Sequence, residues 1–218
     1  MARIGLLGGS FNPAHSGHRH VSLAAMKALD LDEVWWLVSP GNPLKSADGM
    51  APYEARLASA RRIARRSRIR ASDFERQAGT RFTVDTVAAL LRAHPQHRFI
   101  WLMGEDILPQ FHRWKDWRRL ARAIPIAVMT RPGYKSGARA ARAMGWLRGF
   151  VRPLGSQDWT TWSVPAITFL RLPPNPTSAT ALRARDPLWY EKETTGRLRS
   201  SPMRSDLARN RPHRPQHD

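Results

Sequence analysis

Six short apolar runs alternate with longer segments of helical spacing, and this alternation is the feature that most limits the folds open to the chain. The runs occupy residues 4–7, 34–38, 69–71, 99–103, 126–129 and 167–172. Each run is short, and several contain β-branched or aromatic residues, as strands do. Apolar residues three or four positions apart predict helices at residues 17–29, 53–66, 84–93, 114–123 and 138–148. The alternation predicts a doubly wound, mostly parallel α/β sheet with right-handed crossovers.

The fourth run is apolar at every position. It reads Phe99-Ile100-Trp101-Leu102-Met103, whereas a strand with one face in water would alternate between apolar and polar residues. Helices are therefore expected on both faces of the sheet. In such a sheet, ligands bind beyond the carboxyl ends of the strands, so we expect functional residues in the loops that directly follow the apolar runs.

The composition combines a high positive charge with a complete absence of cysteine. Thirty-six Lys and Arg residues stand against 17 Asp and Glu residues, a net charge of +19, and all but five of the cations are arginine. The lack of cysteine excludes disulfides, thiolate metal sites and cysteine nucleophiles. Arginine forks onto phosphate oxygens, so the chain favours polyanionic ligands such as nucleotides or nucleic acid.

The two ends of the chain differ from the part between them. The N-terminal apolar stretch is interrupted by Asn12 and Pro13, too early for a signal peptide, and no segment supplies the roughly 20 apolar residues of a membrane helix. A cytoplasmic protein with no membrane partner is therefore expected. Residues 187–218 contain much Arg and Pro but few apolar residues. This composition predicts one folded domain, residues 1–186, followed by a basic, disordered tail with no catalytic role.

The loop after the first run has the residues of a phosphate-binding site. It reads Gly8-Gly9-Ser10-Phe11-Asn12-Pro13-Ala14-His15-Ser16-Gly17-His18. Neither G-x-G-x-x-G nor a Walker motif is present. Glycines nevertheless let the backbone approach a phosphate, and the helix start that follows offers N–H donors and a positive dipole end. His15 and His18 share one face there. A tight turn and a surface histidine are the alternative, and no metal site is expected, because zinc needs four ligands.

A second segment near residue 180 also reads as a helix start. Thr177 or Ser178 can cap the helix, and Arg183 lies on its first turns. Hydroxyls, the dipole and a guanidinium together can bind an anion. From the residues alone, an ordinary capped helix with a solvated arginine is favoured.

These two segments together resemble the nucleotidyltransferase superfamily, whose first motif is G-(S/T)-F-(D/N)-P-x-H-x-G-H. The resemblance implies a Rossmann-like core and an ATP site. It implies that His15 and His18 act as donors to the triphosphate and stabilise the transition state with Arg183. The second family motif, I-S-S-T-x-I-R, is matched at Ser178, Thr180 and Arg183, while Ala179 replaces Ser and Leu182 replaces Ile. The remaining implied ATP-binding residues are Gly8, Gly9, Ser10, Phe11, Ser178 and Thr180.

Further segments resemble the bacterial nicotinate-nucleotide adenylyltransferases within that superfamily. Gly104-Glu105-Asp106 resembles a turn whose Asp contacts a ribose, and Trp114 matches a tryptophan that stacks on a pyridine ring, while Trp117 is expected to pack internally. Helix-start N–H groups at Thr83 and the backbone at Lys115 are implied to hold the nicotinate carboxylate. The other implied acceptor-binding residues are Asn12, Lys45 and Arg131, with Leu44 standing where the family usually has His.

The resemblance implies the reaction of ATP with nicotinate mononucleotide to give deamido-NAD and pyrophosphate. It also implies Mg²⁺, bound mainly through the ATP phosphates and water. Another phosphate acceptor, nicotinamide mononucleotide or phosphopantetheine, is the alternative substrate. A basic nucleic-acid-binding protein is the non-enzyme alternative; against it, the arginines are spread over many helix faces and no specific nucleic-acid module is found. The oligomeric state, including a homo-oligomer, stays open.

Overall fold

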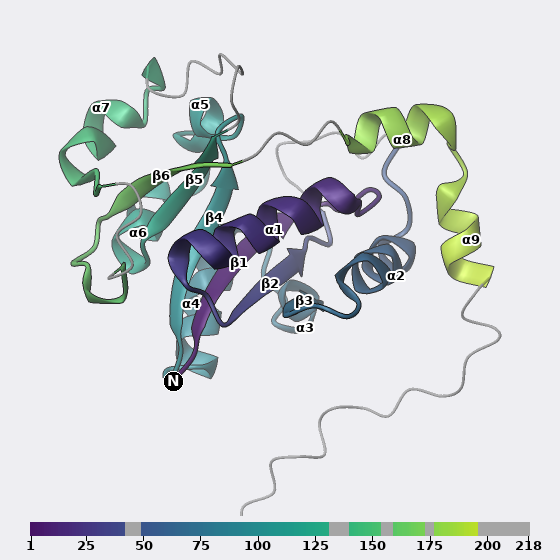
Figure 1. The fold of residues 1–218 in the computed structure, drawn as a ribbon, viewed down its shortest axis with the longest axis horizontal. Coiled ribbons are helices and arrows are strands. Elements are labelled where there is room, and N and C mark those ends of the chain that lie inside the picture. Colours follow the sequence, from purple (N-terminus) through teal and green to yellow (C-terminus); the bar gives the residue numbers. More distant parts are fainter. Residues whose placement is uncertain (42–48, 131–139, 154–158, 173–176, 196–218) are drawn as a thin grey trace, which may run out of the picture.

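A computed structural model describes residues 1–41, 49–130, 140–153, 159–172 and 177–195 (Figure 1). Its centre is a six-stranded sheet in the order β3-β2-β1-β4-β5-β6, and every pairing is parallel. The predicted α/β, Rossmann-like, doubly wound fold is therefore confirmed. The strands are β1 (Arg3–Gly9), β2 (Glu33–Val38), β3 (Ile69–Ser72), β4 (Arg98–Gly104), β5 (Ile126–Thr130) and β6 (Ile167–Arg171).

The helices connect these strands and cover both faces of the sheet. In Figure 1, α1 crosses the near face of the sheet, and α4 lies behind it. Contacts join α1 to α2 on one side and α4 to α6 on the other. The principal helices are α1 (Ser16–Leu29), α2 (Tyr53–Ala64), α4 (Thr83–Ala93) and α6 (Trp117–Ala123), and the short ones are α3 (Phe74–Gln77), α5 (Leu108–Phe111), α7 (Met144–Leu147), η2 (Arg148–Phe150) and η3 (Trp159–Thr161).

Alternate residues of β4 enter two separate cores. Trp101 and Met103 pack with α4, α5 and α6, whereas Ile100 and Leu102 pack with α1 and α2. Successive side chains of a strand point to opposite faces, so a run that is apolar throughout can serve both cores. The expectation of a sheet covered on both faces is confirmed by these two clusters.

Three predicted helices differ from the observed ones at their ends. The helix predicted from residue 114 begins at Trp117, after Asp116 in a left-handed conformation with φ of +46°. The helix predicted to reach residue 66 ends at Ala64, before Arg66 with φ of +56°. The segment predicted as one helix over 138–148 is broken: residues 138 and 139 lie outside the described residues, and α7 covers only Met144–Leu147.

Two further helices, α8 (Ala179–Arg185) and α9 (Trp189–Thr195), follow the last strand, and α9 lies beside α2 (Figure 1). Trp189 is only 8% exposed and packs with Ala51 and Ala55, while Glu193 pairs with Arg62 of α2. Residues 187–195 were predicted to belong to the disordered tail. That assignment is corrected for these residues, because a buried tryptophan anchors them. Residues 196–218 lie outside the described residues.

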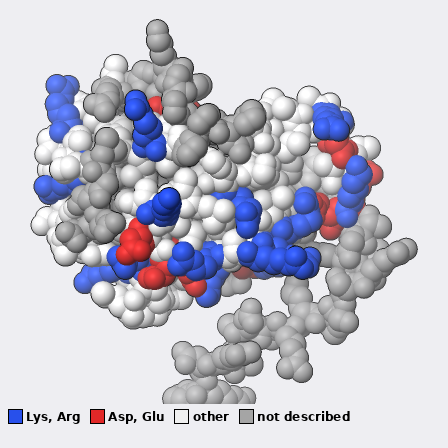
Figure 2. All heavy atoms as spheres, in the orientation of Figure 1, with Lys and Arg blue, Asp and Glu red and all other residues white. Residues whose placement is uncertain are grey.

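Positive side chains occur over many parts of the surface. On the face drawn in Figure 2, Lys and Arg are spread over several elements, and a larger group lies where α2 meets β3. That junction carries exposed arginines at 61, 62, 65, 66, 68 and 70. None of the described helices combines the length and apolar character that crossing a membrane would require.

Candidate active site

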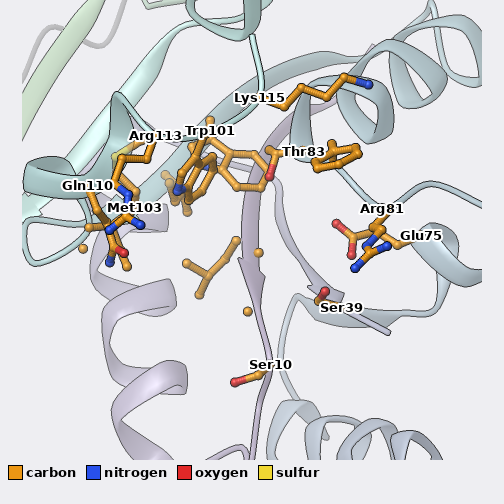
Figure 3. Close-up of a pocket in the computed structure, with 18 residues that line it drawn as sticks. Ser10, Ser39, Glu75, Arg81, Thr83, Trp101, Met103, Gln110, Arg113 and Lys115 are labelled. Carbon is orange, nitrogen blue, oxygen red and sulfur yellow. The ribbon is translucent and has the colours of Figure 1, made fainter. Parts of the chain in front are cut away.

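A pocket opens where β1 and β4 lie side by side, at their carboxyl ends. This is the switch point of the strand order, where the chain turns from one half of the sheet to the other and where ligands bind in such folds. Figure 3 shows the side chains around it. The lining residues come from β1, β2 and β4 with the residues just after them, from α3, from the start of α4 and the residues before it, and from α5 with the residues on either side of it: Leu7, Gly8, Gly9, Ser10, Ser39, Glu75, Arg81, Phe82, Thr83, Trp101, Leu102, Met103, Gly104, Ile107, Gln110, Arg113, Trp114 and Lys115.

Two tryptophans form an aromatic wall in this pocket. Trp101 lies edge-on to Trp114, with ring centroids 6.1 Å apart. A Cβ added to Gly8 would lie 2.7 Å from the Trp101 ring, so the absence of a side chain at Gly8 is what lets that ring lie against β1. Trp114 is half-buried and lines the pocket, and its stacking on a pyridine ring stays a prediction. Trp117 is partly buried and packs against Phe111 of the core.

Thr83 and Lys115 lie on one side of the pocket in Figure 3. Thr83 is the first residue of α4, and the N-cap position belongs to Phe82, which makes no side-chain cap. Thr83 therefore lines the pocket without capping the helix, and its implied contact with the acceptor stays a prediction. The Lys115 ammonium pairs with Asp85 at 3.1 Å and lies over the Phe82 ring.

His15 and His18 form a reciprocal cap at the start of α1. Nδ1 of His15 accepts a hydrogen bond from the Gly17 N–H at 3.1 Å, and Nδ1 of His18 accepts one from the His15 N–H at 3.2 Å. A neutral imidazole that accepts with one ring nitrogen carries its proton on the other. Both neutral rings therefore carry the proton on Nε2, the donor form that a phosphate ligand requires.

Gly17 is required by the position of the His15 ring. A Cβ at Gly17 would lie 2.8 Å from that ring and 3.1 Å from the carbonyl oxygen of Thr177. The glycine of the H-x-G-H segment thus lets an imidazole and a second chain segment approach the same helix turn. This explains the residue type by geometry.

The ring of Phe11 packs against the ring of His18. Its side chain is 1% exposed and its φ is +49°, an uncommon conformation for a phenylalanine. The ring stacks on Trp36 at 5.0 Å and contacts His18 at 4.9 Å, both between centroids. The ring of Phe11 therefore lies in the core, and the implied contact of Phe11 with the nucleotide stays a prediction.

The second motif lies against the first. Ser178 caps α8 by accepting from the Ala181 N–H at 3.2 Å. Nη1 of Arg183 donates to the carbonyl oxygen of Asn12 at 2.6 Å, and Nη2 donates to Thr180 Oγ1 at 3.3 Å. Two segments more than 160 residues apart are thus joined at the start of α1, next to the pocket. The solvated arginine favoured by the residues alone is not what the structure contains.

The side chain of Asn12 anchors a neighbouring loop. Its amide donates to the Gly49 carbonyl at 2.8 Å and accepts from the Ala51 N–H at 3.2 Å, and the residue is only 7% exposed. Its implied contact with the acceptor stays a prediction, since these two bonds already use the amide.

Asp106 does not line the pocket. The residue is exposed, and its carboxylate lies so close to Gly104 that a Cβ there would collide with it. Lys45 and Arg131 lie outside the described residues. The ribose contact of Asp106 and the implied contacts of Lys45 and Arg131 therefore stay predictions.

Arg56 is a fully buried arginine that the sequence did not single out. It is 1% exposed. Nη1 donates to the carbonyl oxygens of Ser10 and Ser39, both at 2.7 Å, Nη2 donates to Pro40 at 3.1 Å and Nε donates to Ala51 at 3.0 Å. Burial lowers the pKa of this guanidinium. One cation thereby fixes the loops that follow β1 and β2, and places positive charge beneath the Gly8–Ser10 backbone.

Glu75 is the second residue that sequence reasoning missed. It is 7% exposed on the short helix α3 and lines the pocket beside Ser39. Burial raises the pKa of this carboxyl to about 7, while hydrogen bonds from Ser39 and Thr86 oppose the rise. Nothing in the local sequence Phe74-Glu75-Arg76-Gln77 separates this glutamate from a surface one.

Among the described residues, no group of three His, Asp or Glu side chains gathers closely enough to hold a metal ion. The polar groups near the pocket and at the start of α1 are mainly N–H donors, hydroxyls and cations. Such a set suits phosphate oxygens.

Three comparisons relate the chain to known proteins. A family model described as cytidylyltransferase-like matches residues 6–185. A protein of Erythrobacter litoralis named probable nicotinate-nucleotide adenylyltransferase is 56% identical over 197 residues, which are 90% of either chain. A protein of the same name from Gluconobacter oxydans is 53% identical over 187 residues, which are 83% of this chain and 93% of that protein.

A solved structure provides the comparison of folds. The chain superposes on the nicotinic acid mononucleotide adenylyltransferase of Plasmodium falciparum complexed with NaAD, with a TM-score of 0.63 over 91% of this chain and 97% of that chain. The two sequences are 16% identical, so this match concerns the fold.

Proposed function

The chain belongs to the cytidylyltransferase-like family and, within it, to the nicotinate-nucleotide adenylyltransferases, and we propose that the pocket and the start of α1 together perform that reaction. ATP is the adenylyl donor and nicotinate mononucleotide is the acceptor. The products are deamido-NAD and pyrophosphate. The observation that carries the assignment of the site is the junction of His15, His18 and Arg183 beside a pocket with an aromatic wall.

The acceptor phosphate is the nucleophile. One of its oxygens attacks the α-phosphorus of ATP, a new P–O bond forms, and the bond to the β,γ-pyrophosphate breaks in line with it. A phosphate monoester is already largely ionised near pH 7, so no side chain has to remove a proton. Catalysis then rests on positioning and on charge stabilisation.

His15 and His18 donate from Nε2 to the phosphate oxygens on which charge develops. Their Nδ1 atoms are held by backbone N–H groups, which fixes both rings before substrate arrives. Donors that need no reorganisation at the moment of reaction are the effective ones. Arg183 adds a permanent charge and holds the loop through Asn12.

The acceptor ring lies in the aromatic part of the pocket. Trp114 stacks on the pyridine, and the backbone N–H groups near Thr83 and Lys115 receive its carboxylate. The N-terminus of α4 supports an anion there through its dipole. Nicotinamide mononucleotide carries a neutral amide instead and leaves one of these donors without a partner.

ATP enters as its Mg²⁺ complex. Mg²⁺ would be held mainly by the ATP phosphate oxygens and water, where it would neutralise part of the triphosphate charge. The chain's own donors act on the remaining charge.

The test is a pyrophosphate-release assay with Mg²⁺ATP and three acceptors: nicotinate mononucleotide, nicotinamide mononucleotide and phosphopantetheine. We expect release with nicotinate mononucleotide and a dinucleotide product identified by mass. Turnover only with phosphopantetheine would overturn the acceptor assignment. No turnover with any acceptor, together with tight salt-dependent binding of oligonucleotides, would favour the nucleic-acid alternative.

A further inference from the structure

Glu75 is a buried acid in the pocket that is proposed to bind an anionic acceptor. Its side chain comes from α3 and lies on the side of the pocket that also holds Ser39 and Arg81 (Figure 3). Among the residues that the structure describes, it forms no salt bridge. An acid that is 7% exposed and has no cation partner in the described part of the chain is disfavoured in its charged form.

Hydroxyl groups are the partners that the structure gives this carboxyl. Thr86 Oγ1 of α4 donates to Glu75 Oε1 at 3.4 Å, and Thr86 is itself bonded to Thr80 Oγ1 at 2.8 Å. Ser39, at the end of β2, forms a second side-chain hydrogen bond. Hydroxyls both donate and accept, so this setting accommodates a neutral acid as well as a carboxylate.

These hydrogen bonds of Glu75 reach the part of the pocket that is proposed to bind the acceptor. Thr86 is three residues after Thr83 on α4, and Ser39 lies directly after β2. Glu75 therefore connects the helix start that is proposed to receive the nicotinate carboxylate with the loop that follows β2. A change in its charge acts on both at once.

The acceptor brings more negative charge into this pocket. Nicotinate mononucleotide carries a carboxylate and a phosphate, and a glutamate carboxylate in the same low-dielectric wall repels both. A neutral Glu75 removes that repulsion and supplies an O–H donor. Binding of the acceptor therefore favours the protonated form of Glu75, and the proton is taken from solvent.

We propose that Glu75 makes acceptor binding proton-linked: the acceptor binds the enzyme in which Glu75 is neutral, and ionisation of Glu75 weakens that binding. The inference rests on the proposed function, because it requires an anionic acceptor in this pocket. Glu75 acts here as a positioning residue in the acceptor site. The raised pKa of Glu75, about 7, puts the change within the range of an ordinary assay.

The other charged and titratable groups on the elements around Glu75 come from α2, α3, the start of α4 and the segments directly before α3, α4 and α6: Tyr53, Arg56, Asp73, Arg76, Arg81, Asp85, Arg113 and Lys115. Burial raises the pKa of Tyr53 to about 12. No histidine is among the residues that line the pocket; His15 and His18 lie outside that lining, at the start of α1. A comparison with Glu75→Gln separates their titration from that of Glu75.

The experiment measures KM for nicotinate mononucleotide at saturating Mg²⁺ATP between pH 7 and pH 8.5. This range lies above the second ionisation of a phosphate monoester, near pH 6. In the wild type we expect KM to rise roughly 10-fold across the range, while kcat changes much less. Glu75→Gln resembles the neutral acid, and its KM should stay within about twofold. The matched control is Glu33→Gln at the far end of β2, which should follow the wild type.

A second measurement does not depend on turnover. Calorimetry of acceptor binding at pH 7.5, in two buffers of different ionisation enthalpy, counts the protons taken up. We expect roughly three quarters of a proton for the wild type, because the free carboxyl is then only about one quarter protonated, and none for Glu75→Gln. A wild-type KM that is flat with pH, or equal proton uptake by both proteins, would overturn the proposal even if the variant were poorly folded. Absence of dinucleotide from the wild type at pH 7 would instead refute the proposed function.

Discussion

Arg183 donates a 2.6 Å hydrogen bond to the carbonyl oxygen of Asn12, a residue 171 positions earlier in the chain. This hydrogen bond joins the loop that follows β1 to α8, the helix that follows the last strand. The same guanidinium is held by Thr180, so its planar fork spans both motifs. A lysine in its place keeps the charge but cannot make two such bonds in one plane.

Replacing Arg183 should therefore reduce turnover, and lysine should reduce it less than alanine does. We expect Arg183→Lys to lower kcat by about 10-fold and Arg183→Ala by about 10²–10³-fold. Steady-state kinetics measures both, and Arg185→Ala, on the exposed side of the same helix, is the control. Equal activity of the Lys variant and the wild type would show that the fork is not used.

The two histidines should each contribute through one preorganised donor. His15→Ala and His18→Ala should each cut kcat by about 10²–10³-fold with the fold intact. Gly17→Ala should also reduce kcat, because its methyl group displaces the His15 ring. Circular dichroism checks the fold and pyrophosphate release gives the rate. Near-normal turnover in any of the three would remove that residue from the proposed mechanism.

Trp114 should determine how tightly the acceptor binds, but not the preference of the enzyme for the acid over the amide mononucleotide. The wild type should prefer the acid over the amide mononucleotide by roughly 5- to 150-fold in kcat/KM, since an unpaired donor costs about 1–3 kcal/mol. Trp114→Ala should raise KM for both acceptors by about 10-fold, the size of one lost stacking contact, and Trp114→Phe should restore part of it. Equal efficiency of the wild type on both acceptors would refute the carboxylate site.

Residues 189–195 should stabilise the fold, whereas residues 196–218 should not contribute to its stability. Ending the chain after Leu188 removes Trp189 from its site against Ala51 and Ala55, and should lower the free energy of unfolding by about 2–3 kcal/mol. Ending it after Thr195 should leave stability and activity unchanged, as expected for a tail with no catalytic role. Urea unfolding of the two shortened proteins tests this, and equal stability would contradict the anchoring by Trp189.

Glu75 should also make the stability of the ligand-free protein depend on pH. Its pKa is raised from 4.5 to about 7 by folding, so the folded protein holds the proton more tightly than the unfolded chain. The stabilising contribution is complete below about pH 4.5 and is lost as pH rises through 7. Between pH 5 and pH 8 the wild type should lose on the order of 3 kcal/mol relative to Glu75→Gln. A constant difference in urea unfolding would contradict this.

Much of the architecture follows from the sequence because strand and helix periods are local. All six predicted strands are present within two residues of their predicted ends, since a short apolar run between polar turns has few other stable arrangements. The helix boundaries at Ala64 and Trp117 were mispredicted, because they depend on backbone conformations that no local pattern marks: Arg65 leaves the helical region with ψ of 143°, and Asp116 is left-handed.

The sequence by itself determined the alternation of strands and helices, the nucleotide motifs and the pairing of His15 with His18, because each strand, helix or motif is encoded within its own short segment. Only the tertiary structure decided that Arg56 and Glu75 are buried, that Trp189 is an anchor and that Arg183 reaches Asn12. Those properties arise from contacts between segments distant in the chain. An arginine in a chain with 31 of them, or a glutamate on a four-residue helix, acquires its chemistry only from the neighbours that packing brings to it.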